Sequence, residues 1–123
     1  MNEYDIFPLD YTDFTITLPD DTFAKESELY FSVVKGAVYL KTKRQYSHFM
    51  NGAKRLGYGK IAEFYRECMN NTFVLEQHDN RLEVCPEIAE VLGEDEPVQI
   101  IIYRDNSGAV IAKKSFFDEK LDK

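Results

Sequence analysis

The sequence predicts an α+β fold in which two similar β modules flank a helical hairpin and a short helix ends the chain. The first observation is a repeat: the stretch Gly-Ala-Val-Tyr-Leu-Lys that begins at Gly36 recurs as Gly-Ala-Val-Ile-Ala-Lys at Gly108, 72 positions later. In both copies an apolar, strand-like run precedes the glycine, and an aromatic-rich segment follows the lysine. The second observation is that apolar residues between the copies follow a helical spacing. We therefore interpret the chain as a pseudo-duplicated β unit with a helical insert.

The first module is expected to consist of strands and tight turns. Alternation of apolar and polar side chains predicts half-buried strands, and proline or glycine marks the places where they end. In chain order, we expect a strand at residues 11–18 that ends at Pro19, one helical turn at 22–25, a strand at 29–35, a turn at Gly36 and a returning strand at 37–41.

The middle of the chain changes to a helical period. The predicted apolar stripe of the first helix consists of Tyr46, Phe49, Met50, Ala53 and Leu56, and that of the second consists of Ile61, Phe64, Tyr65 and Cys68. A break is expected at residues 57–59, and the second helix is expected to end near residue 70. A stripe of methionine and aromatic residues at this spacing is typical of a helix surface that faces the core.

The second module repeats the order of the first. We expect strands at residues 72–77 and 81–85 around a turn at 78–80, a short helix from Pro86 to a Gly93 cap, a strand at 98–103, a return strand at 109–113, and a C-terminal helix that begins at Ser115 with a capping box. No linker or low-complexity segment separates the modules. Residues 1–123 are therefore expected to form a single domain, with half-modules at about 11–57 and 72–121.

Composition limits the cellular compartment and the redox chemistry. Residues 1–4 lack the features of a signal peptide, and no apolar run reaches membrane-spanning length, so we expect a cytoplasmic protein without membrane contact. Cys68 and Cys85 show no CxxC spacing and indicate buried thiols rather than a disulfide framework.

The net charge of −7 is unevenly distributed along the chain. Residues 1–34 carry a net charge of −7, residues 35–66 carry +7, and residues 67–123 carry −7. A basic centre inside an acidic protein is typical of an anion-binding face. It is equally typical of a segment that pairs with acidic flanks within the fold or across an oligomer, and both interpretations stay open.

Several short motifs resemble those of a known family in their order and spacing. They are Ile16-Thr17-Leu18-Pro19, Ile61-Ala62-Glu63-Phe64-Tyr65-Arg66 before Phe73-Val74-Leu75-Glu76, Arg81-Leu82-Glu83-Val84-Cys85-Pro86-Glu87-Ile88 with Gly93, and Ser115-Phe116-Phe117. Together they resemble the MraZ family, regulators found beside bacterial cell-wall and division genes. The resemblance spans roughly residues 11–121 and implies two AbrB-like swapped-hairpin halves.

In the resembled family, an Asp-x-x-x-Arg element just before the strand and proline of each half contacts DNA. Arg81 matches the arginine of this element, but Gln77 occupies the position of the aspartate. Arg81 also lies five residues before Pro86, where the family has four, so a bulge or a shifted register is expected. In the first half, Tyr11 and Thr15 occupy the two positions, so the DNA-reading pair is absent there.

The predicted nucleic-acid-binding residues are Arg81, Lys41, Lys43 and Arg44, and Lys54 and Arg55 are further basic candidates. DNA binding requires such cations on one surface to neutralise phosphates. Arg81 has the alternative of a cross-strand pair with an acidic neighbour. For the four basic residues on the predicted helices, the alternative to DNA contact is a solvent-exposed helix face. These residues are Lys43, Arg44, Lys54 and Arg55.

No other constellation indicates chemistry. His48, Cys68, His78 and Cys85 contain metal-binding atoms, but no two share a ligand spacing, and no nucleophile turn is present. We therefore expect no cofactor, no metal and no enzymatic activity.

Two hypotheses follow from the resemblance and the charge pattern. The first is an MraZ-like, DNA-binding transcriptional regulator that acts as a homo-oligomer. The alternative is a protein–protein interaction module of the same fold that has lost DNA binding and uses its acidic halves to bind a basic partner.

Overall fold

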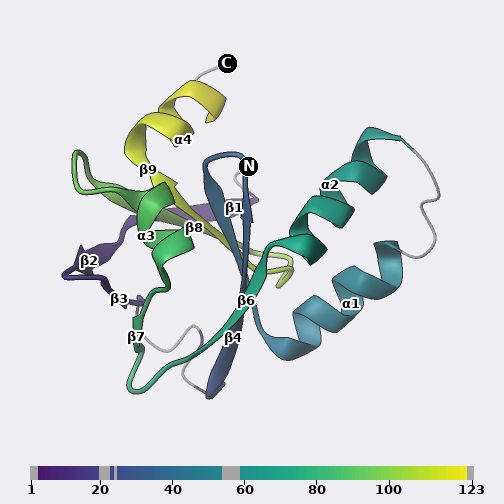
Figure 1. Ribbon diagram of the computed structural model, residues 1–123, viewed down its shortest axis with the longest axis horizontal. Coiled ribbons are helices and arrows are strands. Elements are labelled where there is room, and N and C mark those ends of the chain that lie inside the picture. Colours follow the sequence, from purple (N-terminus) through teal and green to yellow (C-terminus); the bar gives the residue numbers. More distant parts are fainter. Residues whose placement is uncertain (1–2, 20–22, 24, 54–58, 122–123) are drawn as a thin grey trace.

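The computed structural model describes residues 3–19, 23, 25–53 and 59–121, and this part of the chain is an α+β structure with nine strands and four helices (Figure 1). From the N-terminus the elements are β1 (Tyr4–Pro8), β2 (Asp10–Thr12), β3 (Thr15–Thr17), β4 (Glu28–Val34), β5 (Ala37–Lys41), α1 (Lys43–Ala53), α2 (Lys60–Asn70), β6 (Thr72–Glu76), β7 (Arg81–Glu83), α3 (Pro86–Leu92), β8 (Val98–Tyr103), β9 (Ala109–Lys113) and α4 (Lys114–Leu121). The strands form a six-stranded sheet in the order β1-β8-β9-β5-β4-β6 and a three-stranded sheet in the order β2-β3-β7, and both are antiparallel.

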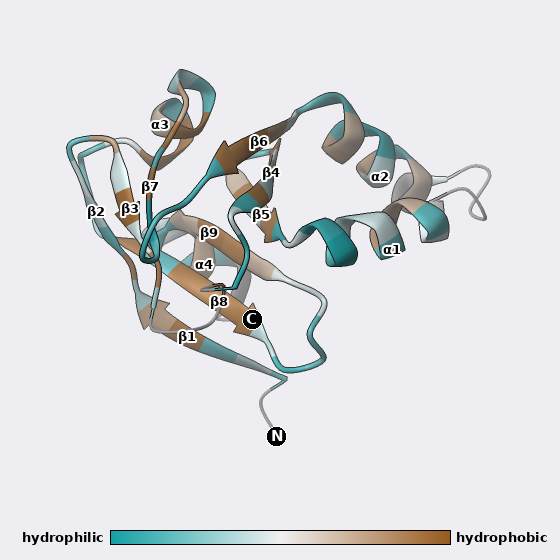
Figure 2. Ribbon diagram, turned by 90° about the horizontal axis from the view of Figure 1, so that it is seen from below, coloured by the Kyte–Doolittle hydropathy of each residue, from teal (hydrophilic) through white to brown (hydrophobic). Residues whose placement is uncertain are grey.

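The six-stranded sheet is covered on both faces. The three-stranded sheet and α3 lie on one side, and the α1–α2 hairpin lies on the other (Figures 1 and 2). Strand β5 shows this alternation, because Val38 and Leu40 belong to the main core whereas Ala37 and Tyr39 belong to the cluster on the opposite face. Tyr39 also meets Phe64 of α2 edge to face, with ring centroids 5.2 Å apart.

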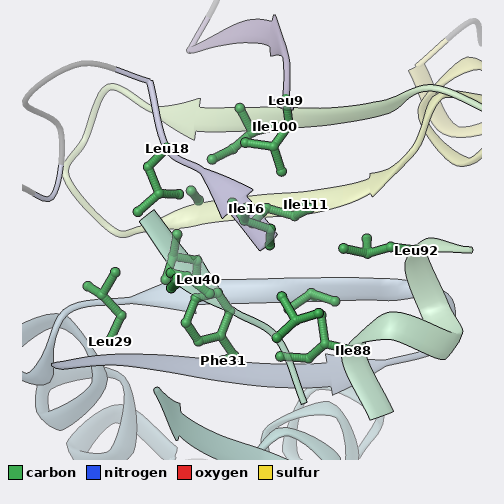
Figure 3. Packing of buried hydrophobic residues seen from close by; sticks show 14 of the residues in the cluster. Leu9, Ile16, Leu18, Leu29, Phe31, Leu40, Ile88, Leu92, Ile100 and Ile111 are labelled. Atoms are coloured by element: carbon green, nitrogen blue, oxygen red, sulfur yellow. The ribbon is translucent and has the colours of Figure 1, made fainter. Parts of the chain in front are cut away.

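The main core fills the space between the two sheets and α3 (Figure 3). Phe31, Leu40 and Ile111 of the large sheet, Ile16 of the small sheet and Ile88 of α3 are all fully buried. Truncating such a side chain to alanine typically costs about 2–5 kcal/mol. Burial at the contact of these elements therefore determines how they pack together.

The two copies of the repeated stretch pair with each other in the middle of the large sheet. Ala37 lies opposite Ala112, and Leu40 lies opposite Ala109, so the two copies run antiparallel and the start of each copy lies beside the end of the other. A tight turn at Lys35 and Gly36 joins β4 to β5, whereas residues 103–108 separate the paired positions of β8 and β9. The predicted strands on either side of both glycines are confirmed.

The pairing of β3 with β7 is a second junction between the chain before the helical hairpin and the chain after it. Leu18 N–H donates to the Asn80 carbonyl at 2.7 Å, and Val84 N–H donates to the Phe14 carbonyl at 2.8 Å. Asn80 and Phe14 each occupy the second position of a turn with positive φ, at 66° and 62°. Each of the two turns therefore has a carbonyl that accepts a hydrogen bond from the chain beside the other turn.

In the N-terminal region one prediction is wrong and one strand was not predicted. Residues 11–18 do not form one strand, because a turn at Asp13 and Phe14, with φ of 51° and 62°, separates β2 from β3. The alternating pattern concealed this turn because phenylalanine is an unusual residue in the left-handed region. Strand β1 was not predicted, because it is short and contains Asp5 and Pro8, which disfavour strands. Its pairing with β8 and an Asp5–Arg104 ion pair of 2.6 Å hold it.

Helix ends differ from the prediction in two places. Helix α4 begins at Lys114, and the backbone N–H of Ser115 donates to Glu96 Oε1 at 2.7 Å, so a distant loop rather than a local capping box supplies its cap. Helix α1 has a capping box that was not predicted: Gln45 N–H donates to Thr42 Oγ1 at 3.1 Å, and Thr42 N–H donates to Gln45 Oε1 at 2.9 Å.

The other helices agree with the sequence. The helical hairpin is confirmed as α1 and α2, and α3 begins with Pro86 and is followed by Gly93 with φ of 58°. The predicted helical turn at residues 22–25 and the predicted break at 57–59 fall largely outside the described residues.

The two repeated glycines differ in the space around them, and this difference is testable. A Cβ at Gly108 lies 2.7 Å from the Leu40 carbonyl oxygen, whereas a Cβ at Gly36 has Phe116 Cδ2 as its nearest neighbour at 3.7 Å. Both residues have positive φ. Gly36→Ala is expected to lower the free energy of unfolding by about 1–2 kcal/mol through backbone strain. Gly108→Ala is expected to lose about 1–3 kcal/mol more through overpacking.

Urea denaturation of both variants checks this prediction, and Gly36→Ala serves as the matched control. Equal losses of unfolding free energy in the two variants would contradict the close approach of β9 to β5.

Candidate anion-binding cleft beside the helical hairpin

The structure brings together two of the four predicted nucleic-acid-binding residues. Lys41 ends β5, and Arg44 lies in the first turn of α1; both line one cleft. Lys43 is exposed beside them but does not line the cleft. Arg81 begins β7 in the three-stranded sheet, which lies apart from α1 in both views (Figures 1 and 2). The basic set is therefore divided between two surfaces.

The cleft lies between the α1–α2 hairpin and the loop that precedes β9, and it has a volume of about 440 Å³. Its lining residues are Lys41, Arg44, Gln45, His48, Phe49, Tyr65, Asn106 and Ser107. None of them is acidic, although the whole chain has 22 acidic and 15 basic residues. The other two basic candidates, Lys54 and Arg55, lie outside the described residues.

Pairing of β5 with β9 places Lys41 against the loop. Because Leu40 lies opposite Ala109, the next residue, Lys41, reaches the chain just before β9. Its Nζ donates to the Ser107 carbonyl at 2.6 Å and lies 5.1 Å from the centroid of the Phe49 ring. Burial lowers the pKa of Lys41. The ammonium is therefore partly withdrawn from water.

The electrostatic surroundings of Lys41 contain little compensating negative charge. The Cys68 thiol and the Asp105 carboxylate act against the burial effect on the pKa of Lys41. Asp105 accepts a hydrogen bond from Ser107 N–H at 3.0 Å, which contributes to lowering its own pKa. Within the described part of the chain, Lys41 forms no ion pair, and its direct partners are a carbonyl and an aromatic ring.

Gln45 fixes α1 to the opposite wall of the cleft. Its Nε2 donates to the Asn106 carbonyl at 3.0 Å and to Asn106 Oδ1 at 3.1 Å. Its Oε1 accepts the Thr42 N–H of the capping box. One side chain thus caps the helix and ties it to the loop, so the two walls are held at a defined separation.

Aromatic side chains form the base of the helical wall. Phe49 of α1 stacks on Tyr65 of α2, with ring centroids 4.2 Å apart and an angle of 15° between the planes. Gly52 of α1 faces the same ring, since a Cβ there would lie at an ordinary contact distance of 3.9 Å from the Tyr65 hydroxyl. Phe49 and Tyr65 are half-buried, so part of the stripe that was predicted to face the core lines the cleft instead.

The first turn of α1 has an unfavourable charge pattern for an isolated helix. It contains Lys43 and Arg44 and no acidic residue, although the positive end of the helix dipole favours acids. This turn is strongly hydrophilic in Figure 2. Lys41, Arg44 and His48 therefore surround the cleft with basic groups that form no ion pair within the described residues.

Arg81 lies on the exposed face of the three-stranded sheet. Its direct partner across the strands is Thr17, which in turn lies opposite Asp10. Among the described residues, no ion pair or hydrogen bond joins the Arg81 side chain to a carboxylate. The expected alternative of a cross-strand pair with an acidic neighbour does not form in this part of the structure. Glu83, two residues along, still places a negative charge on the same face.

Gln77, which stands where the resembled family has aspartate, has a structural role. It is buried, and its Nε2 donates to the carbonyls of Phe23, at 2.9 Å, and Glu26. Its Oε1 accepts the Asn80 N–H at 2.8 Å and so holds the turn before Arg81.

The candidate metal and thiol residues do not form a site. The described ranges contain no group of three or more His, Cys, Asp or Glu side chains placed to share a metal ion. Cys68 is buried, and burial raises its pKa to about 11. Cys85 is half-buried, and burial raises its pKa as well.

Comparison with known proteins adds no assignment. Neither a scan against protein-family models nor a search of curated proteins gave a match to this chain. None of the helices in the described ranges combines the length and apolar character needed to cross a bilayer. The interpretation of the cleft therefore depends on its own geometry.

Sequence reasoning missed six of the residues that line the cleft in this role. They are Gln45, His48, Phe49, Tyr65, Asn106 and Ser107. His48 had a usable signal, because it follows Arg44 by four positions and so lies on the same helix face. Asn106 and Ser107 had none, because only the pairing of β5 with β9 brings them to α1.

Thiol reactivity tests the burial of Cys68. Because burial raises its pKa to about 11, we expect the native Cys85→Ala variant to react with Ellman's reagent at pH 8 about 100-fold more slowly than an exposed thiol. Addition of urea should restore rapid reaction. Fast labelling of Cys68 in the native Cys85→Ala protein would contradict the packing of α2 on β5.

Proposed function

We propose that the chain is an MraZ-like, DNA-binding transcriptional regulator that acts as a homo-oligomer and is built from two related half-modules. The strand order supports the relation between the halves. The first half-module contributes β1, β4 and β5 to the large sheet, and the second contributes β6, β8 and β9 in the same chain order. Exchanging each strand with its counterpart in the other half-module leaves the strand order of the sheet unchanged apart from its direction. The two reciprocal hydrogen bonds, from Leu18 to the Asn80 carbonyl and from Val84 to the Phe14 carbonyl, also support the relation between the half-modules.

The observation that carries the DNA-binding proposal is the exposed Arg81 guanidinium. It lies directly after the turn that Gln77 holds, and it forms no ion pair within the described residues. An exposed arginine on a rigid strand beside a tight turn is suited to contact a phosphate or a base edge. Lys43 and Arg44 would add phosphate contacts from α1.

Oligomerisation is part of the proposal because one copy presents few such contacts. The position in the first half that corresponds to Arg81 in the resembled element is Thr15. A single weak contact per chain gains useful affinity when several linked copies bind repeated DNA sites together.

A second candidate function is binding of a basic protein partner. Asp10 and Glu83 lie on the same exposed sheet face as Arg81 and reduce its attraction for DNA. Beside this face is an apolar groove of about 580 Å³ between Phe14 and α3, with Glu83 and Glu90 at its rim. Phe14 is 52% exposed, which is unusual for a large apolar side chain in a strained turn.

Salt-dependent DNA binding distinguishes the two functions. In fluorescence anisotropy with repeat-containing and random duplexes, we expect affinity to fall steeply as salt increases. Arg81→Ala is expected to weaken binding about tenfold. Arg66→Ala removes the same charge from an exposed position on α2 and serves as the control.

The opposing outcomes are equally specific. Absence of binding at low salt, or equal effects of the Arg81 and Arg66 variants, would refute DNA contact through Arg81. Retention of a basic protein by the wild-type chain after nuclease treatment, with loss in a Phe14→Ser variant, would then support the second function.

A further inference from the structure

We propose that the cleft between α1 and the loop before β9 binds a small phosphorylated molecule, with Lys41, Arg44 and His48 around the phosphate. This inference goes beyond DNA binding, because it assigns a small-ligand site to a surface apart from Arg81. It depends on the charge, the enclosure and the preformed geometry of the cleft.

The charge of the cleft selects an anion. Lys41 and Arg44 are cationic, His48 is protonatable, and no lining residue is acidic. Within the described part of the chain, none of the three forms an ion pair. Such a concentration of cationic side chains outside ion pairs is notable in a chain with a net charge of −7.

The surroundings of Lys41 provide the strongest argument for a bound anion. Its ammonium is withdrawn from water between the Ser107 carbonyl and the Phe49 ring, yet it keeps further N–H groups for an acceptor. Partial burial of a cation is costly, and the nearby Asp105 carboxylate offsets this cost only in part, so a bound anion would stabilise the ammonium further.

The donors fit a phosphate better than a single carboxylate. A guanidinium, an ammonium and an imidazole approach from β5 and from two successive turns of α1. A tetrahedral phosphate accepts hydrogen bonds on several sides at once, whereas a planar carboxylate offers two oxygens. A phosphomonoester also carries more charge than a carboxylate at neutral pH.

The size of the cleft indicates a ligand that carries a larger organic group in addition to its anionic group. At about 440 Å³ it falls within the range of small-molecule sites. Beyond the cations, Phe49 and Tyr65 offer an apolar wall, and Gln45 and Asn106 offer amide groups. Nucleoside monophosphates and sugar phosphates share the required chemistry of a phosphomonoester on a partly polar body.

Hydrogen bonds within the protein hold both walls of the cleft. Gln45 joins α1 to Asn106, and Lys41 joins β5 to Ser107. Such preorganisation reduces the entropy lost when a ligand is held.

Calorimetry and NMR titration of the full chain at low salt test the proposal. The probes are adenosine 5′-monophosphate, glucose 6-phosphate, inorganic phosphate and unphosphorylated adenosine. We expect at least one of the two phosphomonoesters to bind with 1:1 stoichiometry and to shift the side-chain amide signals of Gln45 and Asn106. Adenosine is expected to bind at least about tenfold more weakly than the bound phosphomonoester.

Matched variants assign the binding to the cleft. Arg44→Gln and His48→Ala should each weaken phosphomonoester binding, the former about tenfold, while Arg66→Gln should leave it unchanged within about twofold. Arg81→Ala should also leave it unchanged, which separates this inference from the proposed DNA binding. The proposal is overturned if neither phosphomonoester produces heat or amide shifts, if adenosine binds equally well, or if Arg66→Gln is as damaging as Arg44→Gln.

Discussion

The pairing of β5 with β9 is the constraint on which the rest of the structure depends. It joins the two hairpins into one six-stranded sheet, and its register places Leu40 opposite Ala109. The same register brings Lys41 against Ser107 and requires glycine at position 108, where a Cβ lies 2.7 Å from the Leu40 carbonyl. The core beneath the sheet and the cleft at the end of its central strands therefore both depend on this pairing.

The parts of the fold that follow local rules could be predicted from the sequence. Strands β4, β5, β8 and β9 are apolar runs on either side of glycine turns, and α3 has proline and glycine at its ends. The prediction failed where tertiary contacts decide the outcome. The turn at Phe14 is held in part by Val84 of the other half, and the start of α4 is capped by Glu96, 19 residues before Ser115.

The candidate cleft could be predicted only in part for the same reason. Charge along the sequence identified Lys41 and Arg44, because basic residues are concentrated near them. It could not separate them from Arg81, which lies on the other sheet, or reveal that Gln45 bonds to Asn106 across 61 residues of chain. The basic centre is thus neither wholly paired with acidic flanks nor one continuous surface, because part of it encloses a cleft.

Native-state hydrogen exchange tests most directly the claim that the β5–β9 pairing holds the two halves together. Both strands are hydrogen-bonded on both sides, so their amides should exchange only through global unfolding. The amides of β1 and β6 at the sheet edges should exchange faster, through local opening. If β5 and β9 exchanged as fast as these edges, while β4 and β8 stayed protected, the halves would separate before unfolding and the account would be wrong.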